Sequence, residues 1–119
     1  MPGRTVGRLT TRAAFAALQR SRRRGAAGPV RVAFVPVEAQ APGVFPQVGY
    51  AIGRRCGNAV TRNRLRRRAR EVARAEAPSL ARGRYLVRLG PSASTVSPAE
   101  LRSDVATALH RAGRGVAVR

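Results

Sequence analysis

The chain has 119 residues, enough for one domain with a single modest core. Hydrophobic residues make up 44% of it and aromatic residues only 4%, so we expect an ordered core of valine, leucine and alanine rather than a disordered basic tail. Its 24 cationic side chains, all arginine, face five acidic ones, giving a formal net charge of +19. Charge repulsion of this size opposes compaction, so we expect a polyanionic partner.

Several protein classes are excluded by what the sequence lacks. No apolar run approaches the ~18 residues of a membrane span, and the N-terminus has no signal-peptide core, so we expect a cytoplasmic protein without a membrane partner. The single Cys56 allows neither an internal disulfide nor a multi-cysteine zinc motif. A membrane-surface helix would carry large apolar side chains opposite its cations, whereas the arginine-rich segment has only leucine, valine and alanine there. Nucleic acid is therefore favoured.

The first half of the chain predicts a helix followed by strands. The helix should begin after Thr10 or Thr11 as its cap and end in the arginine run 20–24. Alternating β-branched residues and a proline-containing interval then predict, in order, a short edge strand at about 24–27, a strand at 30–37, a loop at 38–46 and a strand at 48–53.

The second half predicts a helix, a strand and a helix. Asn58 is placed to cap a long helix that reaches Ala77 and ends at Pro78, and a strand follows at 85–89. The last helix begins after Ser97 with a capping-box pattern. Its core face and its end are predicted by helical spacing and a terminal glycine: Leu101, Val105, Leu109, Ala112 and Gly113.

Together these elements predict an α+β fold in the order α-β-β-β-α-β-α, a two-layer sandwich of helices on a sheet. We expect one domain over residues 1–113 and a frayed tail at residues 114–119.

The long helix separates into two faces at about 100° per residue. Its apolar side should pack on the sheet and is formed by Leu65, Ala69, Val72 and Ala73. The opposite side is a polar ridge flanked by Arg66 and formed by Asn63, Arg67, Arg70 and Arg74. Ordinary solvated helix faces mix charges of both signs, but the segment from Arg54 to Arg74 contains nine arginines and one acid, Glu71. This imbalance predicts a phosphate-binding surface.

The start of the same helix predicts an anion site. Gly57 and Asn58 follow a strand through the pair Arg54-Arg55, so free backbone amides and the positive end of the helix dipole lie beside two guanidinium groups. A plain strand-to-helix turn with an asparagine cap would have the same residues.

The segment from Val48 to Arg67, with Gly57-Asn58-Ala59-Val60 followed by Arg62-Asn63-Arg64, resembles the signature of the bacterial ribonuclease P protein subunit. The resemblance implies a left-handed crossover in the sandwich. It also implies the role of accessory subunit of an endoribonuclease: binding the catalytic RNA and the 5′ leader of precursor tRNA while the RNA removes the leader. The residues matched to RNA contact are Arg54, Arg55, Asn58, Arg62, Asn63, Arg64, Arg66 and Arg67, and the ridge adds Arg70 and Arg74.

A cleft between the central helix and the sheet, lined by the first helix, would hold the single-stranded leader in such a protein. The residues assigned to it are Phe15, Gln19 and Phe34. Gln19 stands where the family often has a second aromatic ring, so leader binding would depend more on charge and shape than on stacking. Phe15 can equally pack in the core with Leu18.

No pattern in the chain predicts catalysis by the protein itself. Phosphodiester cleavage needs acid–base groups or metal-binding carboxylates, and His110 and Cys56 have no partner within a motif. Glu71 follows Arg67 by four residues and can pair with it. The resemblance to the ribonuclease P subunit implies that Mg²⁺ is held mainly by the partner RNA, and it implies no protein partner. The alternative is a structural, ribosomal-type protein that neutralises rRNA; a major-groove DNA-binding helix suits the neighbouring strands less well.

Overall fold

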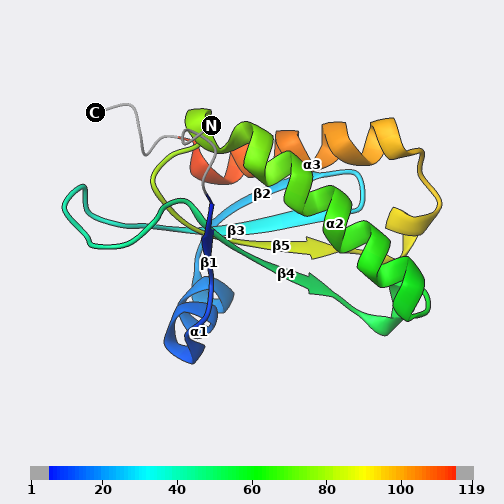
Figure 1. Cartoon of the computed structure of the whole chain (residues 1–119), viewed down its shortest axis with the longest axis horizontal. Coiled ribbons are helices and arrows are strands. Elements are labelled where there is room, and N and C mark those ends of the chain that lie inside the picture. Colours follow the sequence, from blue (N-terminus) through cyan, green and yellow to red (C-terminus); the bar gives the residue numbers. More distant parts are fainter. Residues whose placement is uncertain (1–5, 115–119) are drawn as a thin grey trace.

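The computed structural model describes residues 6–114 and consists of one sheet and three α-helices (Figure 1). In chain order the elements are β1 (Gly7–Arg8), α1 (Arg12–Arg20), β2 (Arg23–Ala27), β3 (Val30–Pro36), β4 (Gln47–Ile52), α2 (Ala59–Glu76), β5 (Gly83–Leu89) and α3 (Pro98–Gly113). The predicted α+β class and the predicted order are confirmed. The structure adds β1, which the sequence did not predict because a two-residue strand has no periodicity.

The strands form one five-stranded sheet in the order β1-β4-β5-β3-β2. β1 pairs with β4, and β4 with β5, in parallel, whereas β3 pairs with β5 and β2 with β3 in the antiparallel sense. α2 connects the neighbouring parallel strands β4 and β5, so it forms the crossover whose left-handed sense the resemblance implies. In the part of the chain described, β1 pairs only with Gln47 and Val48, and the edge of β4 from Gly49 onward carries no further strand.

The two faces of the sheet carry different helices. α2 and α3 lie side by side on one face, and α1 lies on the other face near one end (Figure 1). The larger core lies under α2 and α3, and β3 sends Val30, Val32 and Phe34 into it. The smaller core lies under α1, where Leu18 packs on Ala33. The sandwich of sheet and paired helices is thus the main body, and α1 covers part of its back.

α3 is fixed at its start and along its length. The Ser97 hydroxyl accepts from the backbone amide of Glu100 at 3.1 Å, and the Glu100 carboxylate accepts from the amide of Ser97 at 3.2 Å, which is the predicted capping box. The predicted core face is buried, with Leu101, Val105 and Leu109 at most 1% exposed. Gly25 of β2 allows the close approach of α3, because a Cβ atom there would overlap the backbone of Ala108.

The first helix ends at the first residue of the predicted arginine run. α1 is capped by the Thr11 hydroxyl, as expected, and ends at Arg20, and the predicted short edge strand is present as β2, which begins at Arg23. Pairing of Arg23 with Phe34 begins the β2–β3 ladder, and the Ser21 hydroxyl donates a hydrogen bond to the Phe34 carbonyl. These tertiary contacts outweigh the helical propensity of the arginines.

Candidate nucleic-acid interface

The start of α2 is built from local backbone chemistry. Gly57 adopts φ of 133°, a region that L-residues rarely occupy. Asn58 then caps the helix, because its side-chain oxygen accepts from the Thr61 amide at 2.9 Å. The Thr61 amide is thus used by the protein itself, and the predicted anion site would rely on the neighbouring amides and on the exposed pair Arg54 and Arg55. Arg62 also donates through Nε to the Gly57 carbonyl at 3.2 Å, which fixes it over this turn.

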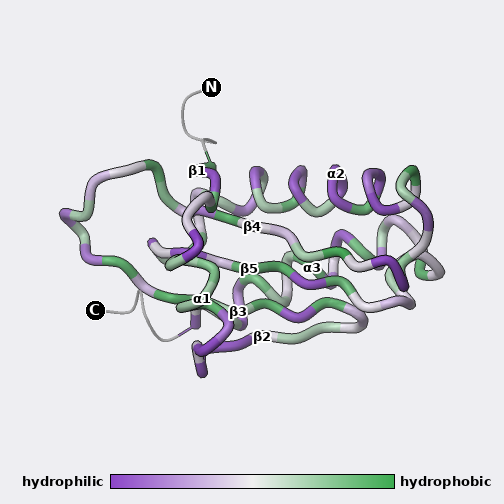
Figure 2. Tube along the Cα trace, turned by 90° about the horizontal axis from the view of Figure 1, so that it is seen from below, coloured by the Kyte–Doolittle hydropathy of each residue, from purple (hydrophilic) through white to green (hydrophobic). Residues whose placement is uncertain are grey.

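The predicted two-faced character of α2 is confirmed. Its buried residues are Leu65, Ala69, Val72 and Ala73. The ridge residues Asn63, Arg67, Arg70 and Arg74 are exposed, as is Arg64. Figure 2 shows the same division, with hydrophilic segments of α2 on the side away from β4. Arg66 is half-buried, and its guanidinium donates a hydrogen bond to the Asn63 side chain at 3.0 Å. This bond holds the two predicted RNA-contact side chains next to each other.

The charge of α2 is not neutralised within the protein. Over residues 6–114 the one salt bridge joins His110 Nε2 to Glu76 Oε1 at 2.7 Å, and no arginine takes part in any. The predicted pairing of Arg67 with Glu71 is wrong, since the two side chains form no ion pair. The expectation that His110 has no partner is also wrong, because α3 brings it to Glu76 across 34 residues of sequence. The guanidinium groups of α2 are therefore available to an external polyanion.

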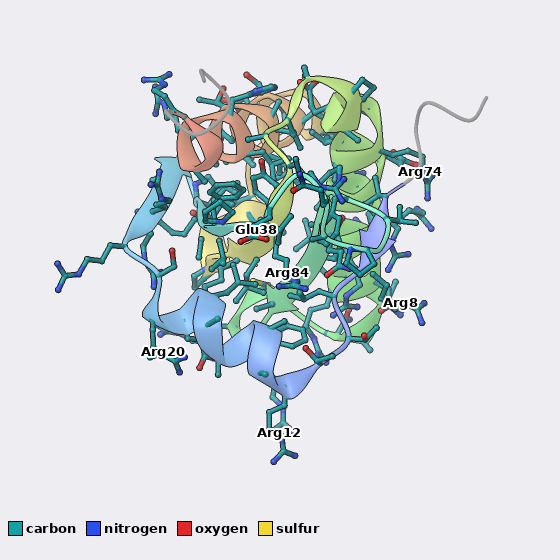
Figure 3. The ribbon with its side chains drawn as sticks, turned by 90° about the vertical axis from the view of Figure 1, so that its left-hand side faces the viewer. Arg8, Arg12, Arg20, Glu38, Arg74 and Arg84 are labelled. Carbon is teal, nitrogen blue, oxygen red and sulfur yellow. The ribbon has the colours of Figure 1, made fainter. Side chains whose placement is uncertain are left out.

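A groove of about 680 Å³ runs between α2, the β1–β4 edge and the start of α1. Four arginines and no acid line it: Arg8, Arg66, Arg70 and Arg74. Its other lining residues are Val6, Gly7, Leu9, Phe15, Val48, Gly49 and Tyr50. Figure 3 shows Arg8 and Arg74 on the same flank of the molecule, projecting from β1 and α2. The row of arginines that faces the groove has the spacing i, i+4, i+8, so it is shifted from the predicted ridge and shares only Arg70 and Arg74 with it.

Tyr50 forms part of the groove wall beneath these arginines. The Arg70 guanidinium carbon lies 5.9 Å from the centre of its ring, within cation–π range. Burial raises the pKa of Tyr50 to about 12, although the charges of Arg70 and Arg74 act to lower it. The hydroxyl is therefore protonated at neutral pH. It is buried and has no hydrogen-bond partner among the described residues.

The three residues assigned to leader binding lie in three different environments. Phe15 is half-buried and lines the groove, where it also packs with the smaller core. Gln19 is exposed on α1 outside the groove. The assignment of Phe34 is wrong, because its ring is 0% exposed and lies 4.7 Å from the Tyr85 ring in the larger core. Alternation along β3 puts Phe34 on the same face as Val30 and Val32.

Other arginines form contacts within the fold. Arg82 donates to the carbonyls of Glu38 and Ala41, with 2.5 Å to the latter, and thereby fixes the long β3–β4 loop. Its guanidinium also lies 4.5 Å from the centre of the Phe45 ring. Arg111 of α3 similarly donates to the Ala26 carbonyl of β2 at 2.8 Å. Composition alone did not distinguish these structural arginines from those of α2.

The described residues offer no catalytic constellation. The acidic side chains of Glu38, Glu71, Glu76, Glu100 and Asp104 are dispersed, and over residues 6–114 no three His, Cys, Asp or Glu side chains are grouped as metal ligands. Cys56 is buried, and its thiol contacts the carbonyls of Leu89 and Gly90 at 3.3 Å each. Within the described residues, no helix is both long and apolar enough to cross a membrane.

An acid-free groove lined by arginines beside an exposed arginine ridge defines a protein that binds a nucleic-acid backbone. A family model described as ribonuclease P matches residues 4–113. The chain therefore belongs to the ribonuclease P family, the protein components of an RNA-containing, tRNA-processing nuclease.

Individual relatives agree with this assignment. The chain is 42% identical over 84 residues to the ribonuclease P protein component of Symbiobacterium thermophilum, covering 70% of this chain and 73% of that protein. It is 39% identical over 98 residues to that of Acidothermus cellulolyticus, covering 82% and 80%. A structure of a Staphylococcus aureus RNase P protein mutant with defective mRNA degradation activity has the same fold, with a TM-score of 0.72 at 17% identity over 82% of this chain and 80% of that one.

Proposed function

We propose that this protein binds the catalytic RNA of ribonuclease P through the exposed arginines of α2 and the 5′ leader of precursor tRNA in the adjoining groove. In this role it assists the RNA-catalysed removal of the leader, which produces the mature 5′ end of tRNA. It acts in the cytoplasm, and its partners are the two RNAs.

The observation that carries this proposal is the unpaired charge of α2. Seven arginines lie on this helix, and none of them forms a salt bridge over residues 6–114. Each guanidinium can fork onto phosphate oxygens, and each phosphate neutralised releases condensed counterions. Asn63 and Arg67 of the ridge lie outside the groove lining, whereas Arg70 and Arg74 belong to both the ridge and the groove. This arrangement supports contact of one helix with two adjoining RNA segments.

The groove supports binding of a single strand. Three of its four arginines lie on α2 and the fourth, Arg8, on β1, and the half-buried ring of Phe15 lies among the remaining lining residues. A flexible strand can place phosphates against the arginines and a base against the ring. A duplex has no such freedom to turn its bases toward a protein.

Catalysis is assigned to the RNA in this proposal. Guanidinium groups have no lone pair for a metal ion and do not serve as general bases at neutral pH. Mg²⁺ is therefore held mainly by the RNA, and the protein contributes by lowering the repulsion between the substrate and catalytic RNAs.

The test is reconstitution with a bacterial ribonuclease P RNA at low Mg²⁺, followed by the rate of precursor tRNA cleavage. We expect strong stimulation by the wild-type protein, because its arginines replace part of the charge screening that Mg²⁺ supplies. Binding of the RNA without any stimulation would instead indicate a structural, rRNA-type protein.

A second experiment tests the leader groove separately. Precursor tRNAs with a leader of several nucleotides and with a single nucleotide are compared for affinity to the assembled enzyme. We expect that shortening the leader removes most of the affinity that the protein adds. Equal affinity for both substrates would contradict leader binding in the groove and leave catalytic-RNA binding intact.

A further inference from the structure

One polar side-chain group in the groove forms no hydrogen bond in the free protein. The Tyr50 hydroxyl is buried and forms no hydrogen bond with any residue over 6–114. A buried donor without a partner destabilises the folded state, because the group has given up its hydrogen bonds to water without replacing them. Tyr85, the other tyrosine of the sheet, lacks this defect, because its hydroxyl donates to the Ala81 carbonyl at 2.6 Å.

The surroundings of Tyr50 determine what can satisfy its hydroxyl. Arg70 lies over the ring, and the charges of Arg70 and Arg74 act on the hydroxyl. Guanidinium groups are donors only, so they compete with the hydroxyl for the same kind of partner. An oxyanion that accepts several hydrogen bonds at once would satisfy the arginines and the tyrosine together, and the groove has no acidic side chain to supply one.

We propose that Tyr50 is a phosphate-binding residue of the groove, whose hydroxyl donates a hydrogen bond to an RNA phosphate oxygen that Arg70 and Arg74 also hold. Arg70 turns from the ring toward the phosphate, which opens the hydroxyl to the ligand. The inference rests on the proposed function and deepens it, because it names a neutral donor within a surface otherwise formed by charge.

The uncharged character of this contact makes it separable from the arginines. Removing a phosphate-binding arginine lowers affinity and also reduces the dependence of log affinity on log salt by ~0.7–0.9. Removing a neutral hydroxyl also lowers affinity, but it leaves unchanged the number of counterions that are released when RNA binds. Tyr50→Phe should therefore weaken RNA binding by about tenfold or more without changing the salt slope, whereas Arg70→Gln should change both.

Tyr85→Phe is the matched control. Both variants delete one hydroxyl from a sheet tyrosine, yet we expect opposite effects. Tyr85→Phe leaves the Ala81 carbonyl without its donor and should lower the melting temperature while RNA affinity stays unchanged. Tyr50→Phe removes an unsatisfied donor and should leave the melting temperature equal or higher while RNA affinity falls.

The experiment measures the affinity of both variants for ribonuclease P RNA alone and, in the assembled enzyme, for precursor tRNA with a long or a one-nucleotide leader. Loss only with the long leader places the phosphate in the leader, and loss with the RNA alone places it in the catalytic RNA. Wild-type affinity of Tyr50→Phe in every assay would overturn the inference, as would equal losses for both tyrosine variants. Failure of the wild-type protein to bind or stimulate would instead overturn the proposed function.

Discussion

α2 and α3 lie side by side on the same face of one sheet, yet their surfaces have different composition (Figure 1). α3 buries six residues and carries two arginines and two acids, Glu100 and Asp104, on the rest. α2 buries four residues and carries seven arginines with two acids, one of which, Glu76, pairs with His110 of α3. α3, whose charges are balanced, is stabilised by burial and capping. α2 carries an excess of positive charge, and none of its arginines forms a salt bridge over residues 6–114.

A small basic domain can be stable and still present a surface for RNA when burial and charge are divided between two helices in this way. The stabilising contacts are concentrated in α3 and the strands that it covers, so α2 can expose like charges along its length. Substitutions in α3 should then change stability, and substitutions on the outer side of α2 should change RNA binding.

The largest effect is expected from Leu109→Ala in α3. Its side chain is 0% exposed, and its removal should lower the free energy of unfolding by about 2–5 kcal/mol. Denaturant unfolding measures this loss, with Val60→Ala as the control, because Val60 on α2 is 69% exposed and surface substitutions usually stay within about 0.5 kcal/mol. Similar losses for both variants would contradict the division between the helices.

The next effect is on RNA affinity. Arg62→Ala combined with Arg66→Ala should weaken binding and reduce the salt slope by about 1.4–1.8, because two phosphate contacts are lost. The control, Arg102→Ala combined with Arg114→Ala, removes the same charge from exposed positions of α3 and its cap. Affinity is measured by titration of ribonuclease P RNA over a range of salt. Equal salt slopes for the two double variants would mean that the arginines of α2 contribute no more to RNA binding than those of α3 and its cap.

A smaller effect is expected at the caps of the two helices. Asn58→Ala and Ser97→Ala should each lower the free energy of unfolding by about 1 kcal/mol, because each removes a side-chain acceptor from a helix start. Asn58→Asp keeps a capping oxygen but adds negative charge at the interface, so it should preserve stability and weaken RNA binding. Thermal unfolding and RNA titration of all three variants measure these effects. Unchanged RNA affinity of Asn58→Asp would show that Asn58 does not belong to the RNA interface.

The smallest effect is expected where the two helices meet. Glu76→Gln removes the carboxylate that His110 contacts, and the side chains of Glu76 and His110 are 32% and 41% exposed, respectively. A partly solvated pair contributes about 0–1 kcal/mol, and salt should reduce this contribution further. Urea unfolding at low and high salt measures it, and RNA affinity should not change. A loss of stability well above this range would show that the contact between Glu76 and His110 stabilises the fold more than its exposure to solvent suggests.

Local patterns in the sequence predicted most of the fold. The buried faces of α2 and α3 and the capping box of α3 follow from spacing within a single helix, so no tertiary knowledge is needed. The orientation of Phe34 also follows from the sequence, because alternation along the strand puts its side chain on the same face as Val30 and Val32. This alternation contradicts the place in the leader cleft that the family resemblance implies for Phe34.

The remaining features depend on contacts between distant segments. The short strand β1 exists only through its pairing with β4, and α1 ends at Arg20 because β2 joins β3. The His110–Glu76 pair spans two helices. The groove requires β1, α1, β4 and α2 together. The sequence therefore predicted the groove arginines of α2, but neither the position of Arg8 in the groove nor the unsatisfied hydroxyl of Tyr50.

The short β1 strand has a consequence for the protein before it meets RNA. From Gly49 to Ile52, β4 has no strand paired to its outer edge in the part of the chain described, and open edges favour aggregation between copies. Arg66 and Arg70 lie in the groove along this edge, so two copies that approach through it bring like charges together. Conditions that screen or remove these charges should promote self-association of the free protein, and bound RNA should prevent it by covering the edge.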